Sequence, residues 1–175
     1  DEEKTAFRLP ELNVLVVDDD RIACETTCER LEEMGLKSQW VLSGKEAIRK
    51  VVAAHEKQND FSTIIIDLKM PDMDGIETTR RIREKVGPDI PIILISAYDW
   101  TEYETEARAA GVNGFIVKPM LKSSLAYAIK KYTLKEPVHF AFMEPVLEES
   151  FFNGKRVLLV EDNDLNREIA EEILS

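Results

Sequence analysis

With 175 residues, of which 44% are hydrophobic and 33% charged, the chain can form one domain with a buried core, plus a remainder too short for a second domain of that size. Its formal net charge of −11 argues against a nucleic-acid-binding surface, because phosphate backbones are held by clustered Lys and Arg. No apolar run approaches the ~20 residues of a membrane span and the N-terminus does not read as a signal peptide. We therefore expect a cytoplasmic chain that makes no contact with a membrane.

Strands and helices are predicted to alternate five times along the chain. Short runs rich in Val, Ile and Leu predict strands over residues 12–17, 36–42, 61–66, 91–95 and 112–117. Apolar residues three or four apart predict helices ending at 34, beginning at 43, following 75, and covering about 99–110 and 121–132. This alternation predicts an α/β fold with a parallel, doubly wound sheet. The segment 36–42 is the least apolar of the five and is expected at a sheet edge.

Helix ends and cysteines carry simpler predictions. Asp19 or Asp20 can cap the first helix, and Ser43 followed three residues later by Glu46 is a capping-box pattern. The two cysteines lie four residues apart on the first helix, which predicts buried thiols rather than a disulfide or a metal site. The two histidines, at positions 55 and 139, are interpreted as surface residues without a ligand role.

Polar residues follow directly after four of the predicted strands. Asp18 and Asp19 follow the first strand, Asp67 the third, Ser96 the fourth and Lys118 the fifth. Ligands of open α/β sheets bind at the carboxyl ends of the strands, so these side chains form one cluster if the strands are parallel neighbours. Each residue alone could be a helix cap or a solvated strand end. Independent helix caps and solvated strand ends explain poorly why polar residues follow four strands at once.

The order of these motifs resembles the receiver domain of two-component response regulators over about residues 10–135. The motifs are the acidic pair at Asp18, the run DLKMPDMDG that begins at Asp67, Ser96 followed by Ala, and Lys118 followed by Pro119. The resemblance implies a flavodoxin-like (βα)5 three-layer sandwich with strand order 2-1-3-4-5. It also implies transfer of a phosphoryl group to Asp67 from the phosphohistidine of a histidine kinase or phosphotransfer domain.

Three converging carboxylates repel one another unless a cation lies between them, and all-oxygen ligation suits Mg²⁺. Asp19 and Asp67 are expected as direct ligands, with Asp18 acting through water. The resemblance adds the backbone carbonyl of Lys69 as a further ligand. In this setting Asp67 is a nucleophile that forms an aspartyl phosphate.

Three further residues are assigned to the phosphoryl group and to the response. Lys118 and Ser96 are expected to contact the phosphoryl oxygens. The resemblance implies a cis bond before Pro119 and makes Ser96 and Phe115 the switch residues, which move when Asp67 is phosphorylated. Phe115 has no hydroxyl group that could fix an inward state, and simple core packing is its plain alternative.

Two alternative functions are weighed against a phosphoacceptor. A pseudo-receiver would serve only for binding or dimerisation, and the intact set of polar residues argues against it. A haloacid-dehalogenase-like phosphatase needs a second Asp two residues after the nucleophile, where this chain has Lys69. Nothing resembles a kinase or a DNA-binding domain. The parent protein is predicted to be a hybrid histidine kinase, because two receivers in tandem, as the internal repeat described next indicates, resemble the C-terminal half of such kinases.

The remaining segments are predicted from the resemblance and from an internal repeat. Residues 1–10 are expected to be a linker, 11–135 the receiver domain and 136–153 an interdomain linker. The run from Val157 to Asn163 matches Val14 to Asp20, so residues 154–175 are predicted to be the first strand and helix of a second receiver domain. We expect this βα fragment to self-associate, through its strand or through the face of Leu165, Ile169 and Ile173.

Overall fold

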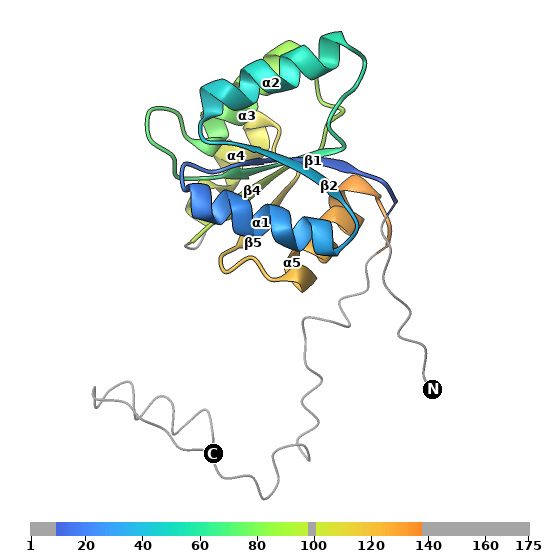
Figure 1. Cartoon of the computed structure of the whole chain (residues 1–175). Coiled ribbons are helices and arrows are strands. Elements are labelled where there is room, and N and C mark those ends of the chain that lie inside the picture. Colours follow the sequence, from blue (N-terminus) through green and yellow to red (C-terminus); the bar gives the residue numbers. More distant parts are fainter. Residues whose placement is uncertain (1–9, 98–100, 138–175) are drawn as a thin grey trace, which may run out of the picture. The chain divides into compact units, whose positions relative to one another are not determined.

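Five parallel strands form one sheet with helices on both faces (Figure 1). The structure is a computed structural model, and it describes residues 10–97 and 101–137. The chain divides into two units, Asp1–Val138 and His139–Ser175. The predicted second linker, the second βα fragment and its self-association therefore lie almost wholly outside the described residues, as does His139. The predicted domain boundaries stay predictions.

The strands are β1 (Asn13–Val17), β2 (Lys37–Val41), β3 (Thr63–Asp67), β4 (Ile92–Ser96) and β5 (Gly114–Val117). The helices are α1 (Arg21–Glu33), α2 (Gly44–Glu56), α3 (Gly75–Val86), η1 (Thr101–Tyr103), α4 (Glu104–Ala110), α5 (Lys122–Ala128) and the π-helical turn η2 (Ile129–Thr133). Where a helix was predicted over about 99–110, the described residues form a 3-10 turn followed by α4. The last predicted helix ends in the π-helical turn.

The strand order is β2-β1-β3-β4-β5, with every neighbouring pair parallel, so the predicted doubly wound fold is confirmed. Strand β2 lies at an edge, as its composition predicted. The central strands β3 and β4 are buried at every residue, because helices cover both faces of the sheet. Val17 pairs with Ile66 in the register of β1 and β3, so the residues that follow them come side by side.

Two apolar cores lie on opposite faces of the sheet. Along β1, Leu15 and Val17 pack into the core beneath α2, α3 and α4, whereas Val14 and Val16 pack into the core beneath α1 and α5. This alternation is the two-residue period of a strand. Figure 1 shows the same arrangement, with α2, α3 and α4 above the sheet and α1 and α5 below it.

The helix caps partly follow the predictions. Asp20, rather than Asp19, caps α1, because its carboxylate accepts a hydrogen bond from the backbone N–H of Ile22 at 2.8 Å. Ser43 caps α2 through the N–H of Glu46 at 3.3 Å. The Glu46 carboxylate accepts from Leu42 at 3.2 Å, one residue before the position that a capping box uses.

Both cysteines are buried free thiols, as predicted. Burial raises the pKa of Cys24 to about 12, and its thiol donates to the backbone carbonyl of Asp18 at 3.4 Å. Burial also raises the pKa of Cys28. His55 is half exposed and its Nδ1 lies 3.0 Å from a carboxylate oxygen of Asp60, which fits a surface residue.

Arg83 holds three backbone segments together at the amino ends of β4 and β5. Its guanidinium donates to the carbonyls of Gly87 at 3.2 Å, Ile90 at 2.8 Å and Gly111 at 2.9 Å. It also donates to the side-chain oxygen of Asn113 at 2.9 Å. Burial lowers the pKa of Arg83, but a guanidinium stays charged in proteins, so all these bonds are charge-assisted.

We expect Arg83→Ala to lower the free energy of unfolding by about 2–4 kcal/mol, because several half-buried acceptors lose their donor. Arg83→Lys should recover only part of this loss, since one ammonium cannot reproduce the planar fork. Urea denaturation measures the effect. Arg81→Ala is the matched control. Arg81 lies on the same helix and forms an exposed ion pair with Glu77, so its loss should change stability by less than about 1 kcal/mol. Equal losses in the two variants would contradict the assignment.

Candidate functional site

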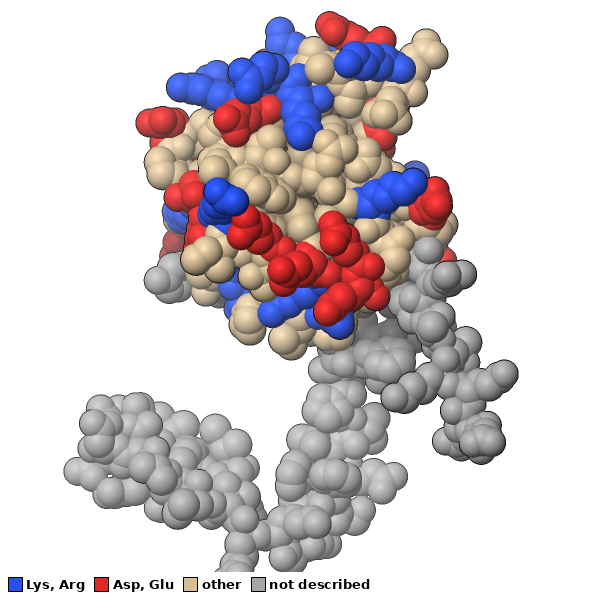
Figure 2. Space-filling model, viewed as in Figure 1, with Lys and Arg blue, Asp and Glu red and all other residues tan. Residues whose placement is uncertain are grey.

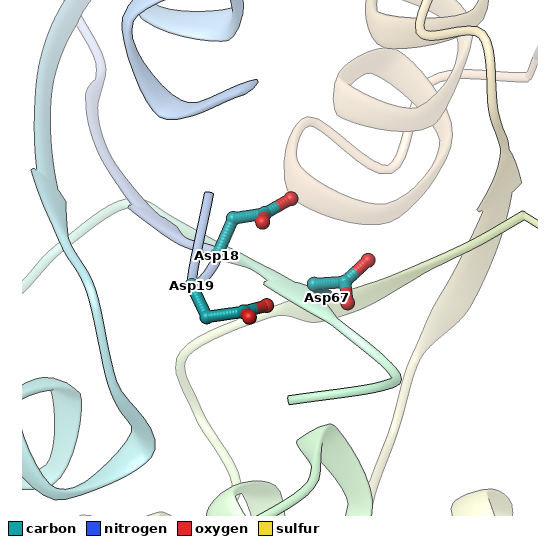
Figure 3. Close-up of side chains that lie close together, drawn as sticks. All are labelled: Asp18, Asp19 and Asp67. Carbon is teal, nitrogen blue, oxygen red and sulfur yellow. The ribbon is translucent and has the colours of Figure 1, made fainter. Parts of the chain in front are cut away.

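Three carboxylates meet at the carboxyl end of the sheet. One oxygen from each of Asp18, Asp19 and Asp67 lies within 4.8 Å of the others. Figure 3 shows the side chains coming from the ends of the adjacent strands β1 and β3. Asp18 and Asp67 are only 2% and 5% exposed, whereas Asp19 faces solvent. The convergence predicted from the strand ends is therefore present, with two carboxylates buried and one open to solvent.

Lys118 reaches the two buried carboxylates from the end of β5. Its ammonium lies 2.8 Å from Oδ1 of Asp67 and 3.2 Å from Oδ2 of Asp18. Among the residues that the structure describes, Lys118 is the only basic side chain that pairs with these carboxylates. Its backbone N–H donates to the carbonyl of Ser96 at 2.8 Å, and its bond to Pro119 is cis, as the resemblance implied.

Asp67 and Lys118 differ in how well the site stabilises their charged forms. Burial raises the pKa of Asp67 above its usual value, and the hydrogen bond and charge of Lys118 only partly oppose this, while the charge of Asp18 adds to it. Burial lowers the pKa of Lys118, but its hydrogen bond with Asp67 and the two acidic charges outweigh burial and leave that pKa raised. The site thus holds a firmly protonated ammonium beside a carboxylate that is less stable than it would be in water.

This raised pKa predicts a pH-dependent gain in stability for Asp67→Asn in the absence of divalent metal. The contribution of Asp67 to stability is present below its unfolded-state pKa and is lost as the pH rises through its folded-state pKa. Near pH 7 the uncharged Asn should therefore stabilise the fold by on the order of 1 kcal/mol. The gain should shrink towards about pH 4. Urea titrations in EDTA at both pH values measure it, and a gain that is independent of pH would contradict the prediction.

The backbone around Asp67 fixes its carboxylate. Oδ2 accepts a hydrogen bond from the N–H of Lys69 at 3.1 Å, in the loop between β3 and α3. Ser96 is the last residue of β4 and is 4% exposed, at the end of the strand next to β3. These positions are compatible with the predicted metal carbonyl of Lys69 and the predicted phosphoryl contact of Ser96, and both roles stay predictions.

Phe115, the predicted switch residue, is partly buried on β5. It pairs with Leu94 in the strand register and packs against the core beneath α4. The guanidinium of Arg108, on α4, lies 5.5 Å from the centre of its ring. Phe115 thus contacts both β4 and α4, where a movement of either could be transmitted, and its switching role remains a prediction.

Two features near the site were not predicted from the sequence. The side chain of Lys69 turns away from the carboxylates, because its ammonium donates to the hydroxyl of Tyr103 at 2.7 Å and lies 4.2 Å from the ring centre. Gly75 packs so closely on β3 that a Cβ there would lie 2.6 Å from the backbone carbonyl oxygen of Asp67. Neither contact has a sequence signal, since each joins segments that only the folded chain brings together.

Comparison with known proteins identifies the family of this chain through the same part of the sequence. The model of the response regulator receiver domain matches residues 14–130, which include every residue of the acidic cluster and Lys118. The chain belongs to the response regulator receiver domain family. This receiver domain has the buried Asp cluster that fits a phosphoacceptor site, so the family match favours a receiver over the phosphatase alternative.

Similar receiver domains occur in larger signalling proteins. Hybrid signal transduction histidine kinase L of Dictyostelium discoideum is 34% identical over 123 residues, which cover 68% of this chain and 7% of that protein. The chain therefore spans a small fraction of this relative. The chemotaxis protein CheY4 of Vibrio cholerae has a crystal structure with a TM-score of 0.63 and 27% identity, covering 70% of this chain and 99% of that one.

A third similar structure is the receiver domain of the histidine kinase CKI1 of Arabidopsis thaliana, complexed with Mg²⁺ and BeF₃⁻. It is 32% identical with a TM-score of 0.58, and the match covers 66% of this chain and 87% of that one.

Within residues 10–97 and 101–137, none of the helices has the length and apolar character needed to cross a bilayer.

Proposed function

We propose that Asp67 is the phosphoacceptor of this receiver domain in a phosphorelay. The observation that carries the proposal is the position of Asp67, a buried carboxylate with an ammonium at 2.8 Å and two further carboxylates beside it. A buried carboxylate with a raised pKa is destabilised as an anion and is a stronger base than a free one. Attack on phosphorus gives an acyl phosphate, in which the charge of the carboxylate is replaced by charge on the phosphoryl oxygens that nearby cations can stabilise.

In the proposed reaction, an oxygen of the Asp67 carboxylate attacks the phosphorus of a phosphohistidine. The new O–P bond forms as the P–N bond breaks, and the electron pair of that bond returns to the imidazole nitrogen. We expect Lys118 to stabilise the negative charge on the phosphoryl oxygens, because its ammonium lies beside Asp67. The hydroxyl of Ser96 would donate to another phosphoryl oxygen and so link the modification to the end of β4.

The acidic cluster also fits a Mg²⁺ ion. Three carboxylates that offer oxygens within 4.8 Å of one another are the hard, all-oxygen donor set that this ion prefers. Asp19 and Asp67 would hold the ion directly, Asp18 through water, and the carbonyl of Lys69 would complete the protein ligands. When bound, Mg²⁺ supplies positive charge that neutralises the carboxylates and the phosphoryl oxygens. The Mg²⁺ in the similar CKI1 receiver supports this assignment.

We infer a protein as the phosphodonor, either a histidine kinase or a histidine phosphotransfer domain. Ile22 in the first turn of α1 is 73% exposed, and Leu121, just beyond Lys118, is 54% exposed. Large apolar side chains at the rim of a polar site are suited to contact with a protein surface. The similarity to hybrid kinases also supports a parent protein of that kind, in which the repeat near 157–163 begins a second receiver domain.

Incubation with acetyl phosphate and Mg²⁺, followed by intact-mass measurement, tests the assignment of Asp67. We expect the wild type to gain one phosphoryl group, and Asp67→Asn to gain none. EDTA should abolish the gain in the wild type. Asp60→Asn is the control, because Asp60 is an exposed carboxylate that pairs with His55 away from the cluster. Phosphorylation that persists in Asp67→Asn, or in EDTA, would overturn the proposal.

A further inference from the structure

A groove between α2 and α3 carries concentrated positive charge. Two exposed basic residues line it from α2, Lys45 and Arg49, and two from α3, Arg81 and Lys85. Within each pair the residues are four apart, so each helix presents a row of two charges about 6 Å apart along its axis. Figure 2 shows Lys and Arg gathered at the top of the molecule, over α2, and Asp and Glu gathered lower down, over α1.

The floor of the groove is apolar. Ile48 lies on α2 between the two basic residues of that helix, and Met73 comes from the loop between β3 and α3. The hollow has a volume of about 500 Å³, which is enough for several side chains of a ligand. An apolar floor between two cationic rows can accept an apolar side chain and the carboxylates on either side of it.

The protein itself neutralises this charge only in part. Within the described residues, Lys45, Arg49 and Lys85 form no ion pair or hydrogen bond through their side chains. Among the described residues that line the groove, only Glu84 is acidic, and Arg81 pairs with Glu77. Like charges four residues apart repel each other along a helix, so the fold gains nothing from the row on α2. The groove is positively charged although the chain as a whole has a formal net charge of −11.

We propose that this α2–α3 groove binds an acidic amphipathic helix of a partner protein. An apolar residue of that helix would contact Ile48 and Met73, while its carboxylates would pair with the two basic rows. A protein helix fits better than nucleic acid or an anionic membrane, because the groove has an apolar floor, a phosphate backbone offers no apolar side chain to it, and a membrane surface is too broad to enter it. None of the residues that line the groove belongs to the Asp cluster.

Fluorescence anisotropy with a designed peptide tests this proposal. The probe is a labelled helical peptide of about 18 residues with Leu on one face and Glu on its flanks, and its control has Gln in place of every Glu. The wild type should bind the Glu peptide about tenfold or more tightly than the Gln peptide, and added salt should weaken the binding. Lys45→Glu combined with Lys85→Glu should weaken binding about tenfold or more. Lys57→Glu, at the end of α2 and outside the groove, should leave it unchanged.

Acetyl phosphate phosphorylation provides the folding control, since none of the substituted lysines contacts Asp67. If the double Glu variant fails this control, the neutral pair Lys45→Gln and Lys85→Gln replaces it, with a smaller loss of binding expected. Equal binding of the Glu and Gln peptides would overturn the proposal, as would unchanged binding by the folded charge variants. Tighter binding to phosphatidylserine vesicles or to single-stranded DNA than to the Glu peptide would also overturn it, in favour of a lipid or nucleic-acid site.

Discussion

Gly75→Ala is expected to lower the free energy of unfolding by about 2–3 kcal/mol and to slow phosphorylation of Asp67 at the same time. The added Cβ would lie 2.6 Å from the backbone carbonyl oxygen of Asp67, and 3.0 Å from the Leu94 side chain. A backbone atom cannot rotate away as the end of a side chain can, so β3 and α3 must separate. That displacement moves the Asp67 carboxylate relative to Lys118.

Gly35→Ala is the matched control for this prediction. Gly35 follows Met34, the C-cap of α1, with a φ of +84°, and nothing lies within 4 Å of a Cβ there. This variant should therefore lose about 1–2 kcal/mol from backbone strain alone, without any change at the site. Urea denaturation and the rate of mass gain with acetyl phosphate measure the two effects separately. If both variants are phosphorylated at the wild-type rate, Gly75 is not positioning the phosphoacceptor.

Lys118→Ala is expected to remove the conformational response to phosphorylation, because no other described basic side chain pairs with the buried carboxylates. Without Mg²⁺, the variant should also lose about 2–4 kcal/mol of stability at neutral pH, since Asp18 and Asp67 lose their cationic partner. Mg²⁺ should restore most of that stability by replacing the missing charge. It should not restore the response, which requires a donor that contacts the phosphoryl group.

Backbone amide NMR shifts at Ser96 and Phe115, recorded with Mg²⁺ before and after addition of acetyl phosphate, measure this response. Lys122→Ala, which removes an exposed lysine that pairs with Glu33, is the control and should respond as the wild type does. A Lys118→Ala protein that unfolds at much lower urea than the wild type even with Mg²⁺ would show that Lys118 is structural. Wild-type shift changes in Lys118→Ala would contradict its proposed role in the response.

Much of the fold could be predicted because its local signals agree. The apolar run before Asp67 and the one before Ser96 are continuous, as strands buried on both faces require, and both strands are observed. Alternation of strands and helices then predicts a parallel sheet without any long-range information. The strand order came from the resemblance to receiver domains, because no local pattern shows which strands are neighbours. The polar ends of the strands were enough to predict the Asp cluster once that order was known.

The remaining features depend on contacts between distant segments. The bonds of Arg83 join α3 to the turns before β4 and β5, and nothing in the sequence near Arg83 distinguishes it from the exposed Arg81. The pairing of Lys69 with Tyr103 crosses from the β3–α3 loop to η1. The Glu46 carboxylate accepts from the N–H of Leu42 instead of that of Ser43, a difference of one residue that the capping-box pattern does not show. Such choices are decided by packing rather than by residue type.

The burial of the two cysteines has a practical consequence for observing this receiver domain at work. A thiol whose pKa is raised to about 12 is almost wholly protonated near neutral pH, and only the thiolate reacts readily with maleimides and other alkylating probes. Cys24 and Cys28 are the only cysteines in the chain. A single cysteine introduced at an exposed position on α4 or α5 would therefore accept a fluorophore or spin label selectively. Movements around Phe115 could then be followed in a protein that keeps both native thiols.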